Sequence, residues 1–324
     1  MDLLTLKVGY TSQTNLFLSK NKTMKKISHI AIVGLLLVSS TLFAQQESVF
    51  AFYKNHMILV NPAYAGYNNE TLWTSSIRKQ WTGVPEAPET QAVSYSTPLG
   101  NNMGIGVSAV NDQTFIEKEI FLGVDFSYKI QMDATTDLYL GIKAGGNFYN
   151  LNTTGLETYN IQSDRALESI NTFNPNFGVG AVLKRDKWYA SVSIPRLFNT
   201  SKAVNQSGYA MSVTDRPHIY VSGGYDFDLG PSLVLKPSVM FRYVNGAPTS
   251  LDVTTMLQIE NNLEIGGMYR TDKAYAAMST IRLSKRFVFG YAYEMSTQPT
   301  LAAARNTNEI LLKFQDRKST RLNS

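Results

Sequence analysis

Residues that could carry acid–base or metal chemistry are scarce in this sequence. It contains no cysteine and three histidines, so thiolate nucleophiles, disulfides and cysteine metal sites are excluded. His56 and His218 follow the N-terminal export segment and stand far apart, without ligand spacing. A zinc site or histidine-based catalysis is therefore not expected. We predict no catalytic residue, no bound metal and no cofactor, and we do not expect an enzyme.

Two glycine pairs resemble part of a dinucleotide-binding loop. They are Gly104-Ile105-Gly106 and Gly178-Val179-Gly180, and neither completes G-x-G-x-x-G ahead of a helix. P-loop, G-x-S-x-G and EF-hand patterns are also absent from the sequence. We interpret these glycines as residues on the polar face of β-strands.

The formal net charge of +5 could indicate a nucleic-acid partner. Of the 30 basic and 25 acidic residues, eight basic and two acidic ones lie in segments 1–44 and 316–324, which leaves 22 and 23. Outside these two ends the chain is nearly neutral, and no nucleic-acid partner is expected.

Residues 1–44 are predicted to be an upstream extension plus a signal peptide. Lys25 and Lys26 follow Met24, an apolar run extends over 30–42, and Ala44 is the expected last residue before cleavage. The apolar run is short for a transmembrane helix, although an N-terminal membrane anchor stays an alternative. The polar tail 316–324 lacks strand alternation and is predicted to be non-native.

The elements that must position any site are β-strands, because apolar and polar residues alternate along most of the chain. In 119–131, for example, Val124 and Phe126 share one face while Asp125 and Ser127 share the other. We predict an all-β fold, a transmembrane antiparallel β-barrel of about 14 strands of the bacterial outer-membrane type, over 71–315. The expected strands are 71–81, 90–98, 102–111, 117–131, 136–150, 174–185, 187–195, 217–229, 232–245, 250–260, 262–271, 274–284, 286–295 and 306–315.

The connections between these strands provide an independent check. The three longest, near 151–173, 196–216 and 296–305, all follow odd-numbered strands. Short turns and long loops of such barrels lie on opposite sides of the membrane. If the exported N-terminus is periplasmic, the long loops are extracellular.

The polar strand faces carry charges of both signs, which should face the lumen. These charges could be solvated and paired with one another, or they could form a selectivity site. Pro237 lies inside a predicted strand, where it predicts a bulge or a local break. The lumen-facing charges are Asp125, Lys129, Lys143, Lys184, Lys236, Arg242, Glu264, Arg270, Arg282 and Glu294, and His218 is expected to face the lumen as well.

Residues 45–70 do not fit the strand pattern. They form an apolar segment, predicted to be periplasmic, in which Pro62 and Gly66 make a rigid turn. Such a segment must cover itself against the barrel or a partner, and the sequence leaves open whether it plugs the lumen. The loop 83–89 is likewise stiffened by Pro85 and Pro88.

Four stretches resemble the PorP/SprF membrane proteins of the type IX secretion system of gliding and secreting Bacteroidetes. Glu86 departs from the small residue usual in that family, and the tail extends beyond the usual terminus. The similarity covers about 45–315. Its motifs are Asn61-Pro62-Ala63-Tyr64-Ala65-Gly66, Arg78-Lys79-Gln80-Trp81-Thr82-Gly83 with 87–91, Asn176-Phe177-Gly178-Val179-Gly180 with 188–195, and Lys236-Pro237-Ser238 with 243–248, 251–252 and 266–270.

The resemblance implies a non-catalytic outer-membrane component that supports gliding and the secretion or surface attachment of cargo proteins such as adhesins. Expected partners are other periplasmic and outer-membrane components of the system, a secreted cargo protein and outer-membrane lipid. A passive porin or small-solute channel is the alternative, and an outer-membrane enzyme is a third. The predicted partner-binding residues are Asn61, Pro62, Tyr64, Gly66, Trp81, Pro85 and Pro88.

Overall fold

Strands account for most of the described chain. The structure is a computed structural model that describes residues 50–153, 169–201, 205–206, 209–210, 214–271, 274–297 and 306–317. These residues fall within one compact unit, Glu47–Ser324. The predicted signal peptide, residues 45–49 and residues 318–324 of the tail lie outside the described residues.

Fourteen barrel strands follow one another along the chain. Two further strand pairs lie in the connection after β7: β8 (Thr200–Ser201) pairs with β11 (Thr214–Asp215), and β9 (Asn205–Gln206) pairs with β10 (Tyr209–Ala210). The barrel strands are β1 (Glu70–Lys79), β2 (Glu89–Gly100), β3 (Met103–Thr114), β4 (Glu117–Gln131), β5 (Thr136–Leu151), β6 (Ile170–Arg185), β7 (Trp188–Ile194), β12 (His218–Tyr225) with its continuation β13 (Phe227–Gly230), β14 (Leu233–Val244), β15 (Ser250–Ile259), β16 (Leu263–Arg270), β17 (Ala274–Arg282), β18 (Phe287–Ser296) and β19 (Asn306–Arg317).

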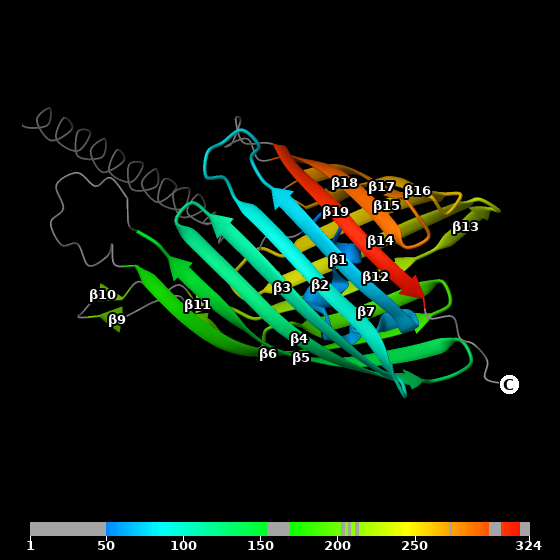
Figure 1. Ribbon diagram of the computed structural model, residues 1–324, viewed down its shortest axis with the longest axis horizontal. Helices are drawn as coiled ribbons and strands as arrows, with labels where there is room; N and C mark the ends of the chain where they lie inside the picture. The colour runs from blue at the N-terminus through cyan, green and yellow to red at the C-terminus, as the bar shows by residue number, and fades with distance from the viewer. Residues whose placement is uncertain are drawn as a thin grey trace, which may run out of the picture. The chain divides into compact units, whose positions relative to one another are not determined.

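Antiparallel pairing joins each barrel strand to its sequence neighbours and closes the ring between β1 and β19 (Figure 1). The closing register runs from Glu70 opposite Arg317 to Lys79 opposite Asn308. Closure gives every barrel strand a partner on each side over at least part of its length, as a sheet in lipid requires. The predicted antiparallel barrel of about 14 strands is confirmed, and each predicted strand overlaps an observed one.

The expected irregularity near Pro237 lies on the neighbouring strand. β14 is continuous and Pro237 pairs in register with Thr255 of β15. On its other side, pairing stops after Gly224 opposite Ser238 and resumes at Phe227 opposite Leu235. Pro237 has no N–H to donate, so the ladder is interrupted opposite it, and β12 and β13 are two parts of one barrel strand.

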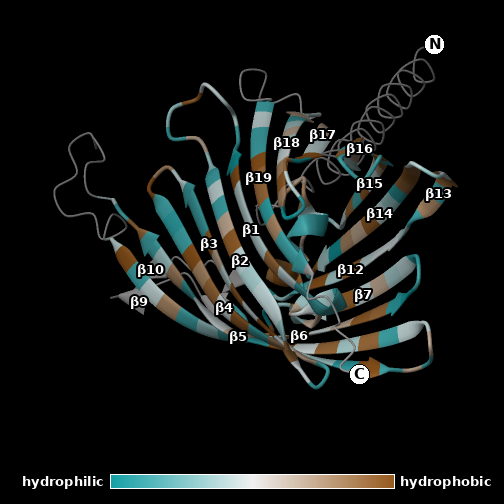
Figure 2. Cartoon of the chain, turned by 45° about the vertical axis from the view of Figure 1, so that its right-hand side comes forward, coloured by the Kyte–Doolittle hydropathy of each residue, from teal (hydrophilic) through white to brown (hydrophobic). Residues whose placement is uncertain are grey.

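Alternating exposure separates the two faces of the wall. Val124 is 52% exposed while its neighbour Asp125 is 0% exposed, and Ile142 is 60% exposed while Lys143 is 1% exposed. Apolar and polar bands alternate along the strands in Figure 2. The apolar face points outward and the polar face inward, as the sequence predicts for a wall surrounded by lipid.

Connection lengths follow the predicted asymmetry. The connections 152–169, 195–217 and 297–305 follow β5, β7 and β18, whereas Asn101 and Asn102 alone join β2 to β3. We call the end of the barrel with the long connections the loop rim and the opposite end the turn rim. β1 begins and β19 ends at the turn rim, and β19 extends to Arg317, two residues past its predicted end.

Short helical turns precede β1 and lie inside the barrel wall (Figure 1). They are η1 (Tyr53–Asn55), α2 (Met57–Val60), η2 (Pro62–Tyr64) and η3 (Tyr67–Asn69). Among the described residues, no helix is long and apolar enough to cross a membrane. We call residues 50–69 the plug, which answers the question that the sequence left open.

Candidate functional site

The plug packs against three sectors of the inner wall. Ala51 and Phe52 join a buried cluster with side chains of β15–β19. Tyr53 and Met57 pack with Tyr220 of β12 and Met240 of β14. Ala63 packs between β5 and β6, against Tyr139 and Val182. Phe52 is 1% exposed and Ala63 is 0% exposed, so the plug forms the centre of a core that the barrel surrounds.

Polar side chains of the wall bind the first half of the plug. Glu309 of β19 accepts hydrogen bonds from the backbone N–H of Ala51 (2.6 Å) and of Phe52 (3.1 Å). His56 Nε2 lies 2.7 Å from the Ser76 hydroxyl of β1. Charge-assisted hydrogen bonds to a carboxylate are among the stronger ones, so Glu309 is the main polar anchor at this end.

Asn61 is the main polar anchor of the second half. It precedes η2, and its Oδ1 accepts from the Ala63 N–H at 3.0 Å. Its Nδ2 donates to the carbonyl of Ala181 on β6 at 3.2 Å and to that of Val192 on β7 at 3.4 Å. The side chain is 0% exposed, and it both caps the turn and ties it to the wall.

Wall side chains also donate to the plug's carbonyl groups. Lys143 Nζ donates to Ile58 O at 3.0 Å, and the Ser193 hydroxyl donates to Val60 O at 2.7 Å. The Ser127 hydroxyl does the same for the carbonyl of Ala65. Backbone groups buried away from water need such partners, so these inward polar residues complement one particular main-chain path.

His56 is held neutral in this setting. Burial, and secondarily the charge of Lys313, lower the pKa of His56 to about 3. The side chain is 2% exposed and stacks on Phe50, with 4.8 Å between ring centroids. It is therefore a packed core residue, and charging it would oppose plug docking.

Above the plug, toward the loop rim, six buried charges form an ion network of Arg78, Arg242, Arg270, Asp252, Glu294 and Glu309. Arg78 lies 2.6 Å from Glu294 and 3.6 Å from Glu309. Arg270 lies 2.8 Å from Asp252 and 3.4 Å from Glu294. Arg242 completes the network at 3.6 Å from Asp252. Three cations balance three anions, which offsets the cost of burying them.

Three further pairs of lumen charges lie close together. Lys143 lies 3.1 Å from Asp125, Lys236 lies 2.7 Å from Glu264, and Lys129 lies 4.0 Å from Asp137. The interpretation of mutual pairing thus describes these pairs, whereas Lys184 donates to Asn68 Oδ1 and Arg282 donates to the carbonyl of Asn261. Arg78, Asp252 and Glu309 also face the lumen, although they are not among the charges predicted to do so. Strand alternation could have found Glu309, since it is out of phase with the outward Ile310 and Leu312.

The loop between β1 and β2 (residues 80–88, the rim loop) is exposed but firmly held. Its Gln80 N–H donates to Pro88 O at 2.9 Å, and its Thr82 N–H donates to Asn306 O at 3.1 Å. Trp81 and Glu86 have φ values of 49° and 55°. Non-glycine residues occupy this region at a cost and often mark functional positions.

The predicted partner-binding residues occupy two separate places. Asn61, Pro62 and Gly66 are buried in the plug and Tyr64 is half-buried there. Gly66 lies against Thr97 and Gly104, near the turn rim. In the rim loop, Trp81 is half-buried, Pro85 is exposed and Pro88 is buried. Ten residues of β1 separate the two groups, about 30 Å of strand, and their partner-binding role stays a prediction.

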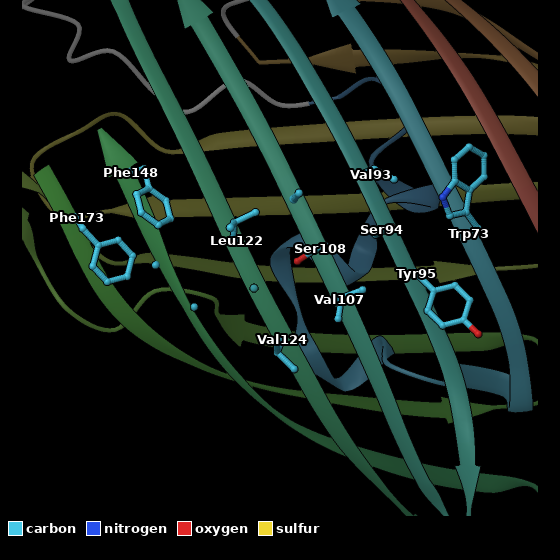
Figure 3. A pocket seen from close by; sticks show the side chains of 14 residues that line it. Trp73, Val93, Ser94, Tyr95, Val107, Ser108, Leu122, Val124, Phe148 and Phe173 are labelled. Atoms are coloured by element: carbon cyan, nitrogen blue, oxygen red, sulfur yellow. The ribbon is translucent and has the colours of Figure 1, made fainter. Parts of the chain in front are cut away.

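Sites for metal or small-molecule chemistry do not emerge from the described residues. Those residues contain no group of three or more side chains that could hold a metal ion. A hollow of about 560 Å³ lies on the outer face of β1–β6 (Figure 3). Apolar side chains surround it, including Trp73, Leu122 and Phe173. It opens on the face that the apolar residues occupy, away from the lumen charges.

Comparisons with known proteins give one family match. The family model described as "Type IX secretion system membrane protein PorP/SprF" matches residues 42–314. A comparison with curated proteins found no match.

Solved outer-membrane structures are similar at low identity. The Acinetobacter baumannii outer membrane protein Omp33 is 8% identical with a TM-score of 0.47, covering 76% of this chain and 98% of that one. The Ralstonia pickettii toluene transporter TbuX is 9% identical with a TM-score of 0.48, covering 79% and 92%. The Pseudomonas putida (P. putida) toluene transporter TodX is 9% identical with a TM-score of 0.46, covering 80% and 93%.

Proposed function

Because the chain belongs to the PorP/SprF family of type IX secretion system membrane proteins, we propose that it supports secretion or surface attachment of cargo proteins such as adhesins. It does so without catalysis, as an outer-membrane barrel exported by its N-terminal signal peptide. Its partners are a secreted cargo protein and other periplasmic and outer-membrane components of the system. The family match over residues 42–314 carries this proposal.

The loop rim is the proposed cargo contact. Val84 is 37% exposed, Pro85 is exposed, and hydrogen bonds to Asn306 and Asn308 hold the rim loop in place. A preorganised apolar loop loses little conformational entropy when a partner binds. The turn rim, reached by β1 and β19, is the proposed contact for periplasmic components.

A matched pair of variants tests this assignment. Val84→Asp and Met132→Asp each place a carboxylate at an exposed apolar rim residue, 37% and 60% exposed respectively. Val84 lies on the loop rim and Met132 lies on the turn rim, between β4 and β5. In a strain lacking the natural gene, Val84→Asp should abolish co-purification of cargo and leave the periplasmic partners bound.

Met132→Asp should leave cargo binding unchanged. Equal cargo binding by the Val84→Asp variant and the unmodified protein would contradict the assignment of the loop rim. The competing function is a passive porin, for which liposome swelling is the test. Solute-selective permeability, combined with intact secretion in a strain lacking the protein, would exclude the role in secretion.

A further inference from the structure

Four inward-facing glycines lie directly behind the plug. They are Gly104 and Gly106 of β3, Gly141 of β5 and Gly180 of β6. A Cβ atom on Gly141 would lie 2.2 Å from Ala63 N, and one on Gly104 would lie 2.1 Å from Ala65 O. On Gly180 it would lie 2.1 Å from Asn61 Oδ1. We call these four residues the glycine groove, because any side chain there would occupy the space of the plug.

The glycine groove lies between the wall side chains that bind the plug's main chain. Lys143 follows Gly141 by two residues and donates to Ile58 O, while Ser193 pairs with Gly180 across the strands and donates to Val60 O. The close contacts with the glycines and the hydrogen bonds from the wall therefore involve the same stretch of the plug, Ile58–Gly66. The inner wall of β3–β7 is a peptide-binding site whose ligand is this chain's own N-terminal segment.

Buried side chains occur on every sector of the inner wall. Each of the fourteen barrel strands contributes at least one buried inward side chain. One such residue per strand, in chain order, is Ser76, Ser94, Ser108, Asp125, Lys143, Asn176, Ser193, Tyr220, Met240, Asp252, Arg270, Ala276, Glu294 and Leu311.

A barrel of this size would be open without the plug. Side chains alone fill barrels of about eight strands, whereas barrels of 16–18 strands leave an aqueous channel. Fourteen strands fall nearer the second case. Several wall residues that face the plug are small, such as Ser76, Ser193 and Gly141, and they leave the space that the plug occupies.

We propose that residues 50–69 are a built-in stopper, bound in the glycine groove, which closes the lumen to solutes and to passing peptide. The barrel then works through its rims and its outer wall and not as a conduit. This inference goes beyond the role in secretion, because it concerns the permeability of the purified protein whichever partner binds the rims.

Planar-bilayer conductance of the full-length barrel tests the stopper. Gly141→Ala adds one Cβ atom where it meets the plug. Gly267→Ala adds the same atom on β16, out of phase with the inward Met268, where the nearest atom is Ala276 O at 3.1 Å. The unmodified protein and Gly267→Ala should stay silent, and Gly141→Ala should raise the frequency of conductance steps at least tenfold.

A thiol reporter shows independently whether the plug has moved. The chain has no cysteine and Met57 is 5% exposed, so Met57→Cys places a single buried thiol in the plug. A water-soluble maleimide should label it slowly alone and at least tenfold faster together with Gly141→Ala. Gly180→Ala, on another strand, repeats the test in case Gly141→Ala fails to insert.

Three results would overturn the proposal. Stable conductance by the unmodified barrel would show that the plug does not close it. Rapid labelling without conductance would show that something other than the plug closes the lumen. A slow-labelling, silent Gly141→Ala barrel would show that the glycine groove does not hold the plug. Co-purification of cargo tests the role of the rims, so its outcome is independent of these three results.

Discussion

Replacing Asn61 with alanine is expected to loosen the plug. The substitution removes the Oδ1 acceptor of the Ala63 N–H and the donor to the carbonyls of Ala181 and Val192. Both Asn61 and Ala63 are 0% exposed, so water cannot replace the lost partner in the docked state. A buried N–H left unpaired costs about 1–3 kcal/mol.

We therefore expect plug docking to weaken by about 2 kcal/mol, which is about a 30-fold change in the population of the released state. Hydrogen–deuterium exchange of the backbone amides of 57–66, in the barrel reconstituted in lipid nanodiscs, measures that population. Exchange should accelerate about 30-fold. Amides in the interior of β16, which pair with β15 and β17 and not with residues 57–66, should keep their rates.

Asn171→Ala is the matched control, because Asn171 is an exposed residue of β6, the strand that Asn61 also contacts. Asn61→Ser should fall between the two, since a serine hydroxyl can still accept from the Ala63 N–H but is too short to bridge to the wall. Less than threefold acceleration in an intact Asn61→Ala barrel would refute the assignment of Asn61 as the anchor.

Three further outcomes are expected. Glu309→Ala removes one of the two carboxylates beside Arg78 and leaves two plug amides without their acceptor, so the unfolding free energy in urea should fall by about 3–5 kcal/mol. Lys187→Met, which removes an exposed ion pair with Asp228, should leave that unfolding curve unchanged. Acidification from pH 8 to 5 should weaken plug docking by about 2 kcal/mol. The pKa of His56 is about 3 in the docked plug and about 6.5 in the released plug, so protonation favours release. The stabilisation by neutral His56 is complete above about pH 6.5 and is lost as the pH falls below that value. Plug-amide exchange measures this, and His56→Gln should reduce the dependence.

Strand positions and wall orientation could be predicted from the sequence because they depend on local geometry. Side chains alternate across a strand, and a lipid-facing wall demands an apolar residue at every second position. Val124 and Asp125 show this directly, since adjacent residues are 52% and 0% exposed. The loop asymmetry is also local, because it follows from the number of residues between successive strands.

The candidate site depends on contacts that local patterns do not encode. Glu309 binds Ala51, which precedes it by 258 residues, and only closure of β1 against β19 brings the two ends of the barrel together. The position of the rim loop could be predicted, but the plugged lumen could not. An apolar segment ahead of the first strand could equally have been covered by a partner.

The glycines of the inner wall were placed by strand alternation, but their role depends on tertiary contacts. Alternation alone placed Gly104 and Gly180 on the inner face, and nothing in their spacing distinguished space for a ligand, a turn or a second chain. The tertiary structure decided that the space belongs to Ala65 and Asn61. A glycine has no side chain whose chemistry could indicate its role, so that role is known only when the atoms packed against the glycine are known.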